Sequence, residues 1–146
     1  MVVRTQIKGF LQMPQMKAKV EENLYGELTY KLIGIAMEIH RELGCGWPER
    51  IYCKAFSLII EEEKINYEKE KEIKIYLKGK MLGKERLDFV IDDKIIVEIK
   101  AKSETKNIHK SQLLSYLKGS GYFVGLLFNF GTEKLEYHRM VHKKSA

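Results

Sequence analysis

Residues 86–100, Arg-Leu-Asp-Phe-Val-Ile-Asp-Asp-Lys-Ile-Ile-Val-Glu-Ile-Lys, decide the fold of this chain. They read as two short strands around a tight turn, with Asp88 in the first strand and Glu98 and Lys100 in the second. Side chains alternate between the two faces of a strand, so the length of the turn decides which residues meet. A three-residue turn over 92–94 gives one wholly apolar face and sets Asp88 opposite Glu98. The apolar pairs in that register are Ile91 with Ile95, Phe89 with Val97 and Leu87 with Ile99.

A two-residue turn over 92–93 is the competing register, and it mixes polar and apolar residues on both faces. Because burial favours a face that is apolar throughout, we expect the three-residue turn. That turn contains no Gly for a backbone position with positive φ, but Asp tolerates such a position.

The predicted Asp88–Glu98 pair has a chemical consequence. Carboxylates directly opposite each other have Cβ atoms about 5 Å apart, and like charges at that distance are unfavourable. A divalent cation offsets the repulsion, and Mg²⁺ typically uses one or two protein carboxylates plus waters. Lys100 beside the pair adds a positive charge that could steady a phosphate or a developing hydroxide. The alternative is a solvated strand face, because a chain with 32% charged residues produces such acid and lysine spacings by chance.

Composition limits the class of protein. The chain has 146 residues, of which 45% are hydrophobic, as expected for one globular domain. No apolar run reaches the ~18 residues of a membrane span, and the N-terminus lacks the continuous apolar stretch of a secretory signal. We therefore expect a cytoplasmic protein with no membrane partner. Cys45 and Cys53 lie outside any C-x-x-C motif, so neither a zinc site nor a disulfide framework is indicated. The net charge of +6 suits a polyanionic partner.

Hydrophobic periodicity predicts the element order α, α, β, β, β, α, β, β. Residues 1–23 lack a clear period and are expected to form a loose, disordered N-terminal arm, residues 24–141 one domain, and residues 142–146 a basic tail. The second helix is expected to bury Ile51, Ala55, Leu58 and Ile59. The predicted helices cover 27–43, 48–63 and 107–118, and the predicted strands cover 66–78, 86–91, 95–100, 122–130 and 135–139. Residues 122–130 are apolar almost throughout, which predicts an interior strand parallel to a neighbour, and 135–139 predict an edge strand.

Three further polar residues attract attention. Glu49 lies in the first turn of the second helix, where the helix dipole alone would favour an acid. Gln112 and Tyr116 are four residues apart and therefore adjacent on one face of the third helix. On the residues alone, a role at the site and a dipole effect explain Glu49 equally well, and an ordinary helix flank is the simpler reading of Gln112 and Tyr116.

Several separated motifs resemble one known family. Residues 46–52, Gly-Trp-Pro-Glu-Arg-Ile-Tyr, match the G-x-x-E-x-x-Y signature of the bacterial and archaeal GxxExxY family, although Trp47-Pro48 is not its usual filling. The resemblance covers about residues 24–141, and that family is similar to the RecB-like part of the PD-(D/E)XK nuclease superfamily. It implies a restriction-endonuclease-like αβββαβ core with a mixed central sheet flanked by helices. Leu87 stands where the superfamily's name has Pro. The other matching segments are His40-Arg41-Glu42-Leu43-Gly44, Asp88, Glu98-Ile99-Lys100, Gln112 to Leu117 and Gly125 to Gly131.

The same resemblance implies a function for each candidate residue. Asp88, Glu98 and Glu49 would hold Mg²⁺ or Mn²⁺, Lys100 would be the catalytic lysine, and Gln112 with Tyr116 would correspond to a Q-x-x-x-Y motif. The expected activity is hydrolysis of phosphodiester bonds in nucleic acid, with DNA favoured over RNA.

Two other hypotheses stay open. One is a non-cleaving nucleic-acid-binding or regulatory module on the same fold, and the other is a homodimer whose self-association completes a substrate groove. Basic residues near the predicted site could contact phosphates, or they could form a solvated face. They are Arg86, Lys102, Lys106 and Lys110, with Lys78, Lys80 and Lys84 in the segment before residue 86.

Overall fold

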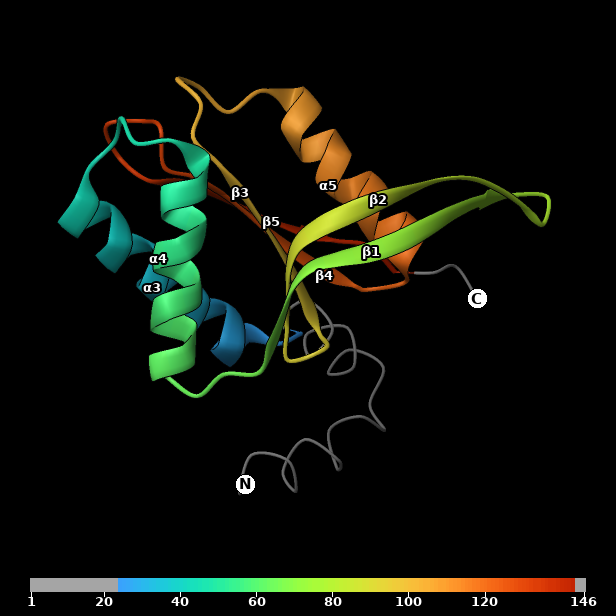
Figure 1. Ribbon diagram of the computed structural model, residues 1–146, viewed down its shortest axis with the longest axis horizontal. Coiled ribbons are helices and arrows are strands. Elements are labelled where there is room, and N and C mark those ends of the chain that lie inside the picture. Colours follow the sequence, from blue (N-terminus) through green and yellow to red (C-terminus); the bar gives the residue numbers. More distant parts are fainter. Residues whose placement is uncertain (1–23, 144–146) are drawn as a thin grey trace, which may run out of the picture.

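The computed structural model describes residues 24–143, and its elements follow the predicted order (Figure 1). The N-terminal arm expected over residues 1–23 and the last three residues of the basic tail lie outside the described part. The helices are α3 (Gly26–Leu43), α4 (Glu49–Glu62) and α5 (Asn107–Ser120). The strands are β1 (Tyr67–Leu77), β2 (Lys80–Ile91), β3 (Ile95–Lys100), β4 (Val124–Asn129) and β5 (Glu136–Val141).

The five strands form one mixed sheet in the order β1-β2-β3-β4-β5. Strands β3 and β4 are parallel and are joined by the crossover helix α5, whereas the other neighbouring strands are antiparallel. The prediction for residues 122–130 is confirmed, because β4 is buried along its whole length and pairs in parallel with β3. Strand β5 closes that side of the sheet as the predicted edge strand.

Helices cover both faces of the sheet. Helices α3 and α4 pack on one face over a core that includes Phe89, Val97 and Phe128. Helix α5 packs on the other face through Leu113 and Leu117. Figure 1 shows the resulting three layers, with the α3–α4 pair and α5 on opposite sides of the strands. The predicted fold class, a mixed sheet flanked by helices, is therefore correct.

The predicted buried face of α4 is only partly correct, because Ala55 and Ile59 pack half-buried against the core but the fully buried residues are others. The residues buried from this helix are Tyr52, Phe56 and Ile60, while Leu58 is 58% exposed. The Tyr52 ring stacks on Phe130 with centroids 4.6 Å apart, and its hydroxyl donates to the Gly44 carbonyl at 2.6 Å. Aromatic rings bury more area than aliphatic side chains, so they set the rotation of the helix.

The predicted register of the hairpin β2–β3 is confirmed where the two backbones pair. Ile91 faces Ile95 and Phe89 faces Val97 across the three-residue turn. Asp92 and Asp93 in that turn adopt positive φ values of 50° and 52°, as Asp tolerates. The backbone ladder then stops at the Phe89–Val97 pair, and Figure 1 shows β2 turning away from β3 beyond it.

The predicted alternation of β2 side chains between the two faces of the sheet fails just beyond the Phe89–Val97 pair. Leu87 packs on the α5 face with Val90, whereas Phe89 packs on the α3–α4 face. The break coincides with an irregularity in β1, where Glu70 has a φ of 55° and the β1–β2 ladder skips the Glu70–Asp88 position. The sheet is thus locally deformed at the residue that was expected to bind metal.

Within residues 24–143, no helix is both long enough and apolar enough to span a lipid bilayer.

Candidate active site

Asp88 and Glu98 bridge the place where β2 and β3 stop pairing. The Asp88 backbone N–H donates to Glu98 Oε1 at 3.1 Å, and the Ile99 backbone N–H donates to Asp88 Oδ2 at 2.8 Å. Each carboxylate therefore replaces a backbone acceptor that the interrupted ladder lacks. Glu98 is only 5% exposed, although an isolated buried charge is costly. The structure places the two acids side by side, linked reciprocally through the backbone.

The electrostatics of this pair are those of a buried diacid. Burial raises the pKa of Glu98 to about 8, and the neighbouring Asp88 carboxylate adds to the rise. Burial also raises the pKa of Asp88, against the opposing effects of the Ile99 N–H, a hydrogen bond to Glu98 and the Lys100 ammonium. At neutral pH and without a cation, Glu98 is therefore mostly protonated. The pair favours a positive charge between its oxygens.

The donor set fits a hard divalent cation. Among residues 24–143, no group of three or more His, Cys, Asp or Glu side chains is arranged to hold a metal. Two carboxylates completed by waters are nevertheless sufficient for Mg²⁺, which keeps several waters in most protein sites. A cation in place of the proton would also remove the repulsion that raises the Glu98 pKa. The chemistry of Asp88 and Glu98 thus suits Mg²⁺ or Mn²⁺.

Glu49 and Lys100 carry opposite charges and both lie near the Asp88–Glu98 pair. Glu49, at the start of α4, lines a cavity of about 280 Å³ together with Asp88. Burial raises the pKa of Glu49, Asp88 raises it further, and Lys100 and Lys102 lower it. Lys100 also opposes the raised pKa values of Asp88 and Glu98. The three acids and Lys100 are therefore close enough to affect one another's pKa, and one cation near Asp88 could be shared with Glu49.

The two α5 candidates differ in position. Tyr116 is half-buried against the α5-side cluster. Burial raises its pKa to about 12, with Glu98, Glu85 and Asp88 adding to the rise, so the phenol stays protonated and can donate a hydrogen bond. Gln112, one turn earlier, is exposed. Within the described residues it makes no hydrogen bond to Asp88, Glu98 or Lys100, so only Tyr116 is electrostatically linked to the acids.

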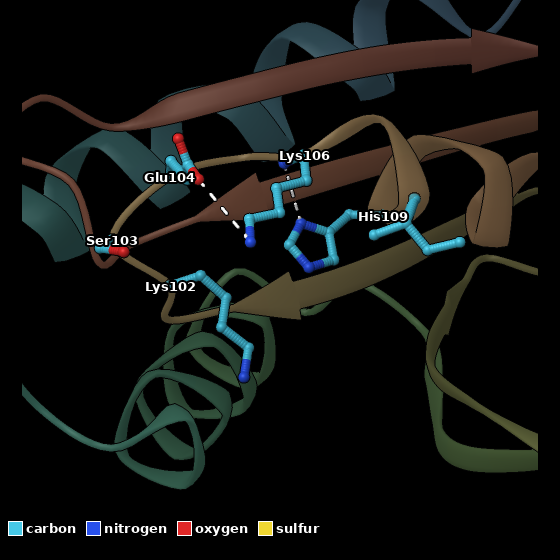
Figure 2. Close-up of a pocket in the computed structure, with 6 residues that line it drawn as sticks. Lys102, Ser103, Glu104, Lys106 and His109 are labelled. Atoms are coloured by element: carbon cyan, nitrogen blue, oxygen red, sulfur yellow. Dashed lines mark hydrogen bonds and ion pairs between the residues drawn. The ribbon is translucent and has the colours of Figure 1, made fainter.

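Two of the four basic candidates gather at one hollow. Lys102 and Lys106 line a cavity of about 310 Å³ with His109, at the start of α5 (Figure 2). The Lys106 backbone N–H donates to His109 Nδ1 at 3.1 Å, so the neutral ring carries its proton on Nε2. Burial lowers the pKa of His109, and Lys100, Lys102 and Lys106 lower it further. Arg86 instead lies exposed on β2 opposite Glu72, and Lys110 lies near His138.

Asn129 is a site residue that the sequence did not single out. It is 1% exposed at the end of β4, beside Lys100 in the parallel ladder. Its Oδ1 accepts the backbone N–H groups of Lys102 and Gly131, each at 3.0 Å, and its Nδ2 donates to Thr105 Oγ1 at 3.0 Å. The side chain therefore fixes the segment that follows Lys100. An amide inside an otherwise apolar run was the available signal.

Two residues of the Asp88 cavity were also missed. Glu70 lines it from β1, and its charge raises the Asp88 pKa. No sequence pattern marks its positive φ. Cys53 lines the same cavity from α4, and burial raises the pKa of its thiol to about 12. A thiol in that state is protonated, so Cys53 is a poor nucleophile.

Comparison with known proteins gives an independent line of evidence. The chain is similar to the solved structure titled "Crystal structure of SSO0001", with a TM-score of 0.53 and 20% identity, over 99% of this chain and 80% of that chain. Such an identity supports the fold alone. No curated protein matches the sequence. The family model of the PD-(D/E)XK nuclease superfamily matches residues 26–140. Since that match covers most of the chain, this protein belongs to the PD-(D/E)XK nuclease superfamily.

Proposed function

We propose that this protein is a metal-dependent nuclease that hydrolyses phosphodiester bonds in nucleic acid, with DNA favoured over RNA as the substrate, and that it acts in the cytoplasm. The observation that carries the proposal is the buried Asp88–Glu98 pair, whose carboxyl groups replace the backbone ladder. A merely structural acid pair would carry the cost of burial with no compensating cation. The similarity of residues 46–52 to the GxxExxY signature supports the same assignment.

Asp88 and Glu98 would hold Mg²⁺ or Mn²⁺, with Glu49 reached directly or through a water. When bound, such a cation supplies Lewis acidity toward the scissile phosphate and lowers the pKa of an attacking water. The acids themselves fix the position of the reacting phosphate relative to β3. Because Glu98 must lose its proton to become a ligand, the site is expected to work better at neutral to alkaline pH.

Lys100 would contribute the fixed positive charge of the site. It follows Glu98 by two residues on β3, so both side chains extend toward the same side of the strand. Its ammonium can orient the attacking water or neutralise charge that develops on the phosphate. Tyr116, protonated because of its raised pKa, can donate a hydrogen bond to a phosphate oxygen. Gln112 would join it only through a change of side-chain conformation.

The basic hollow at the start of α5 would hold a neighbouring phosphate. Lys102, Lys106 and the Nε2–H of His109 supply donors there, and the first turn of a helix favours anions. Ion pairing of Lys106 with Glu104, 3.7 Å apart and exposed, is weak enough for a phosphate to replace it. The hollow thus extends the site along the nucleic-acid backbone.

Cleavage of labelled DNA and RNA by the purified protein tests this proposal. Mg²⁺ or Mn²⁺ should support cleavage, EDTA should stop it, and Lys100→Ala should abolish it while the circular dichroism spectrum stays unchanged. Absence of cleavage on every form of nucleic acid, together with metal-independent binding of DNA, would point to a non-cleaving module.

A further inference from the structure

The hairpin formed by β1 and β2 extends well beyond the body of the protein. These strands contain 11 and 12 residues, whereas β3, β4 and β5 contain 6 each. Figure 1 shows the far half of the hairpin projecting past the end of α5. Helix α5 supports it only as far as Ile75, which lies against Gly119. The tip beyond Ile75, residues 76–82, has no layer covering it.

The tip is built as a defined structure. Lys78 and Gly79 form its turn with φ values of 50° and 77°, and Leu77 pairs with Lys80 across it. Positive φ at both central residues is the geometry of the tight turn that best fits the twist of a hairpin. The register shifts between Ile75 and Tyr76, which leaves Leu82 as an extra, unpaired residue. Such a bulge changes the direction in which the side chains of the bulged strand point.

Large apolar side chains cover this tip and face solvent. Leu82 is 66% exposed, and Tyr76, Leu77 and Met81 are each more than half exposed. A cluster of apolar side chains on a projecting tip is unfavourable for a free protein and usually marks a binding surface.

The charge around the tip identifies the class of partner. Residues 73–84 contain four lysines and no acidic residue. Lys84 pairs with Glu72 at 3.5 Å, while Lys74, Lys78 and Lys80 form no ion pair within the described chain. A second copy of the tip would bring lysines against lysines, which disfavours self-association. A polyanion with apolar faces satisfies both features, because proteins that bend duplexes insert apolar wedges between base steps and hold the flanking phosphates with cations.

The hairpin also connects the tip to the proposed active site. Strand β2 carries both Lys80 and Asp88, and eight residues at about 3.3 Å each put the tip roughly 26 Å from the Asp88 backbone. At about 3.4 Å per base pair, that distance corresponds to about eight base pairs of duplex. One duplex can therefore lie on the acids and on the tip at the same time.

We propose that residues 74–84 form a duplex-binding arm, in which Lys74, Lys78 and Lys80 contact phosphates and Leu77 and Leu82 insert into a groove about eight base pairs from the cleaved bond. The proposal deepens the proposed function, because it assigns double-stranded nucleic acid as the substrate form. It rests on that function only for the position of the cleaved bond.

Binding of a fluorescein-labelled 30-bp DNA duplex in EDTA, followed by anisotropy, tests the arm without cleavage. The first variant is Lys78→Asn/Lys80→Gln, in which Asn at the first turn position keeps the tight turn. The second is Leu77→Ser/Leu82→Ser. The control is Lys31→Gln/Lys64→Gln, which removes the same charge from an exposed position of α3 and from the exposed residue after the C-cap of α4. These positions are exposed, so all three variants should fold.

The lysine variant should lose about tenfold in affinity, and the slope of log K against log salt should fall in magnitude by about 1.8, or 0.9 per phosphate contact. The apolar variant should lose about tenfold in affinity with an unchanged slope. The control should bind like the parent. A 30-nucleotide single strand should bind the parent and the apolar variant alike, because it has no groove for Leu77 and Leu82 to enter.

The proposal of a duplex-binding arm would be contradicted if both arm variants bound the duplex with the affinity and the salt slope of the parent. So would a parent dimer that the Leu77→Ser/Leu82→Ser variant converts to monomer in sedimentation. Parent binding to vesicles containing phosphatidylserine, without binding to the duplex, would also overturn it.

Single-turnover cleavage in Mg²⁺ separates the two proposals. At saturating protein the arm variants should cleave at the parent rate. A parent protein that binds the duplex but never cleaves it would contradict the proposed nuclease activity and would leave the proposed duplex-binding arm intact.

Discussion

The backbone N–H of Asp88 donates a hydrogen bond to the carboxylate of Glu98 at 3.1 Å, at the point where β2 and β3 cease to pair. The bond holds two acids together inside the protein, and burial with Asp88 nearby raises the pKa of Glu98 to about 8. The interrupted ladder thus creates both the position of the acids and their affinity for a positive charge. The predictions that follow test the consequences of this arrangement.

Metal affinity should depend on pH because of Glu98. Below pH 8 this side chain is protonated, and a cation must displace one proton to bind. The association constant for Mn²⁺ should therefore rise by about tenfold per pH unit up to about pH 8 and then level off. Isothermal titration calorimetry between pH 6 and 9 measures this slope. In Glu98→Gln the slope should disappear and the affinity should fall; a parent constant that is flat with pH would contradict the assignment.

The stability of the metal-free protein should also depend on the protonation of Glu98, but it should fall as pH rises. The pKa of Glu98 is raised in the folded state, so the folded protein holds a proton that the unfolded chain loses above about pH 4.5. The free energy of unfolding of the parent should therefore fall as pH rises from 4.5 to 8. Glu98→Gln lacks this penalty and should exceed the parent by roughly 2–4 kcal/mol at pH 8 but by little at pH 4.5. Urea denaturation in EDTA measures both values.

Lys100→Ala should separate chemistry from metal binding. The ammonium is proposed to orient the water or to neutralise the phosphate, so its removal should lower cleavage by about 10²-fold or more. Mn²⁺ should still bind, because the acids remain. Calorimetry beside the cleavage assay provides the comparison, and Lys100→Arg, which keeps the charge, should retain more activity than Lys100→Ala. Equal loss of metal binding and cleavage would assign Lys100 a structural role.

Glu49→Gln should lower Mn²⁺ affinity by about tenfold if Glu49 supports the metal, directly or through a water. The matched control is Glu27→Gln, because Glu27 also lies in the first turn of a helix, α3. Both changes remove the same favourable interaction with a helix dipole, about 0.3–1 kcal/mol. Equal effects of the two variants on stability, with none on metal affinity, would reduce Glu49 to a dipole-compensating acid.

Asn129→Ala should destabilise the segment after Lys100. The change leaves the N–H groups of Lys102 and Gly131 without their acceptor, at a cost of about 2–3 kcal/mol in the free energy of unfolding. Thr105→Ala removes a single hydrogen bond from the same clamp and should cost about 1 kcal/mol or less. Denaturation of the two variants side by side tests the clamp. Equal destabilisation would indicate that the Oδ1 contacts contribute nothing.

Much of the fold followed from hydrophobic patterns alone. The register of the β2–β3 hairpin was predictable because only one turn length gave an apolar face, and the apolar run ending at Phe130 predicted an interior parallel strand. The rotation of α4 was not predictable, because stacking of Tyr52 on Phe130 joins segments far apart in the sequence.

The site was predictable in part. The hairpin register predicted that Asp88 and Glu98 lie side by side, although the backbone ladder ends at the Phe89–Val97 pair before it reaches them. The hydrogen bonds by which they bridge the two strands coincide with the positive φ of Glu70 on β1, which no sequence pattern predicts. Gln112 was expected beside Tyr116, yet its side chain faces solvent, since adjacency on a helix does not fix which neighbour points inward. Asn129 was overlooked because its partners are two backbone N–H groups and the distant Thr105 hydroxyl, which no sequence pattern connects to it.

Cleavage of end-labelled duplex DNA by the parent, Asp88→Asn and Glu98→Gln, in Mg²⁺, Mn²⁺ or EDTA, tests the central claim most directly. The two acids are predicted to hold the catalytic cation, so the parent should cleave only with metal, and each variant should lose about 10²-fold or more of the rate while remaining folded. Undiminished cleavage by Asp88→Asn and Glu98→Gln, or cleavage by the parent in EDTA, would contradict it.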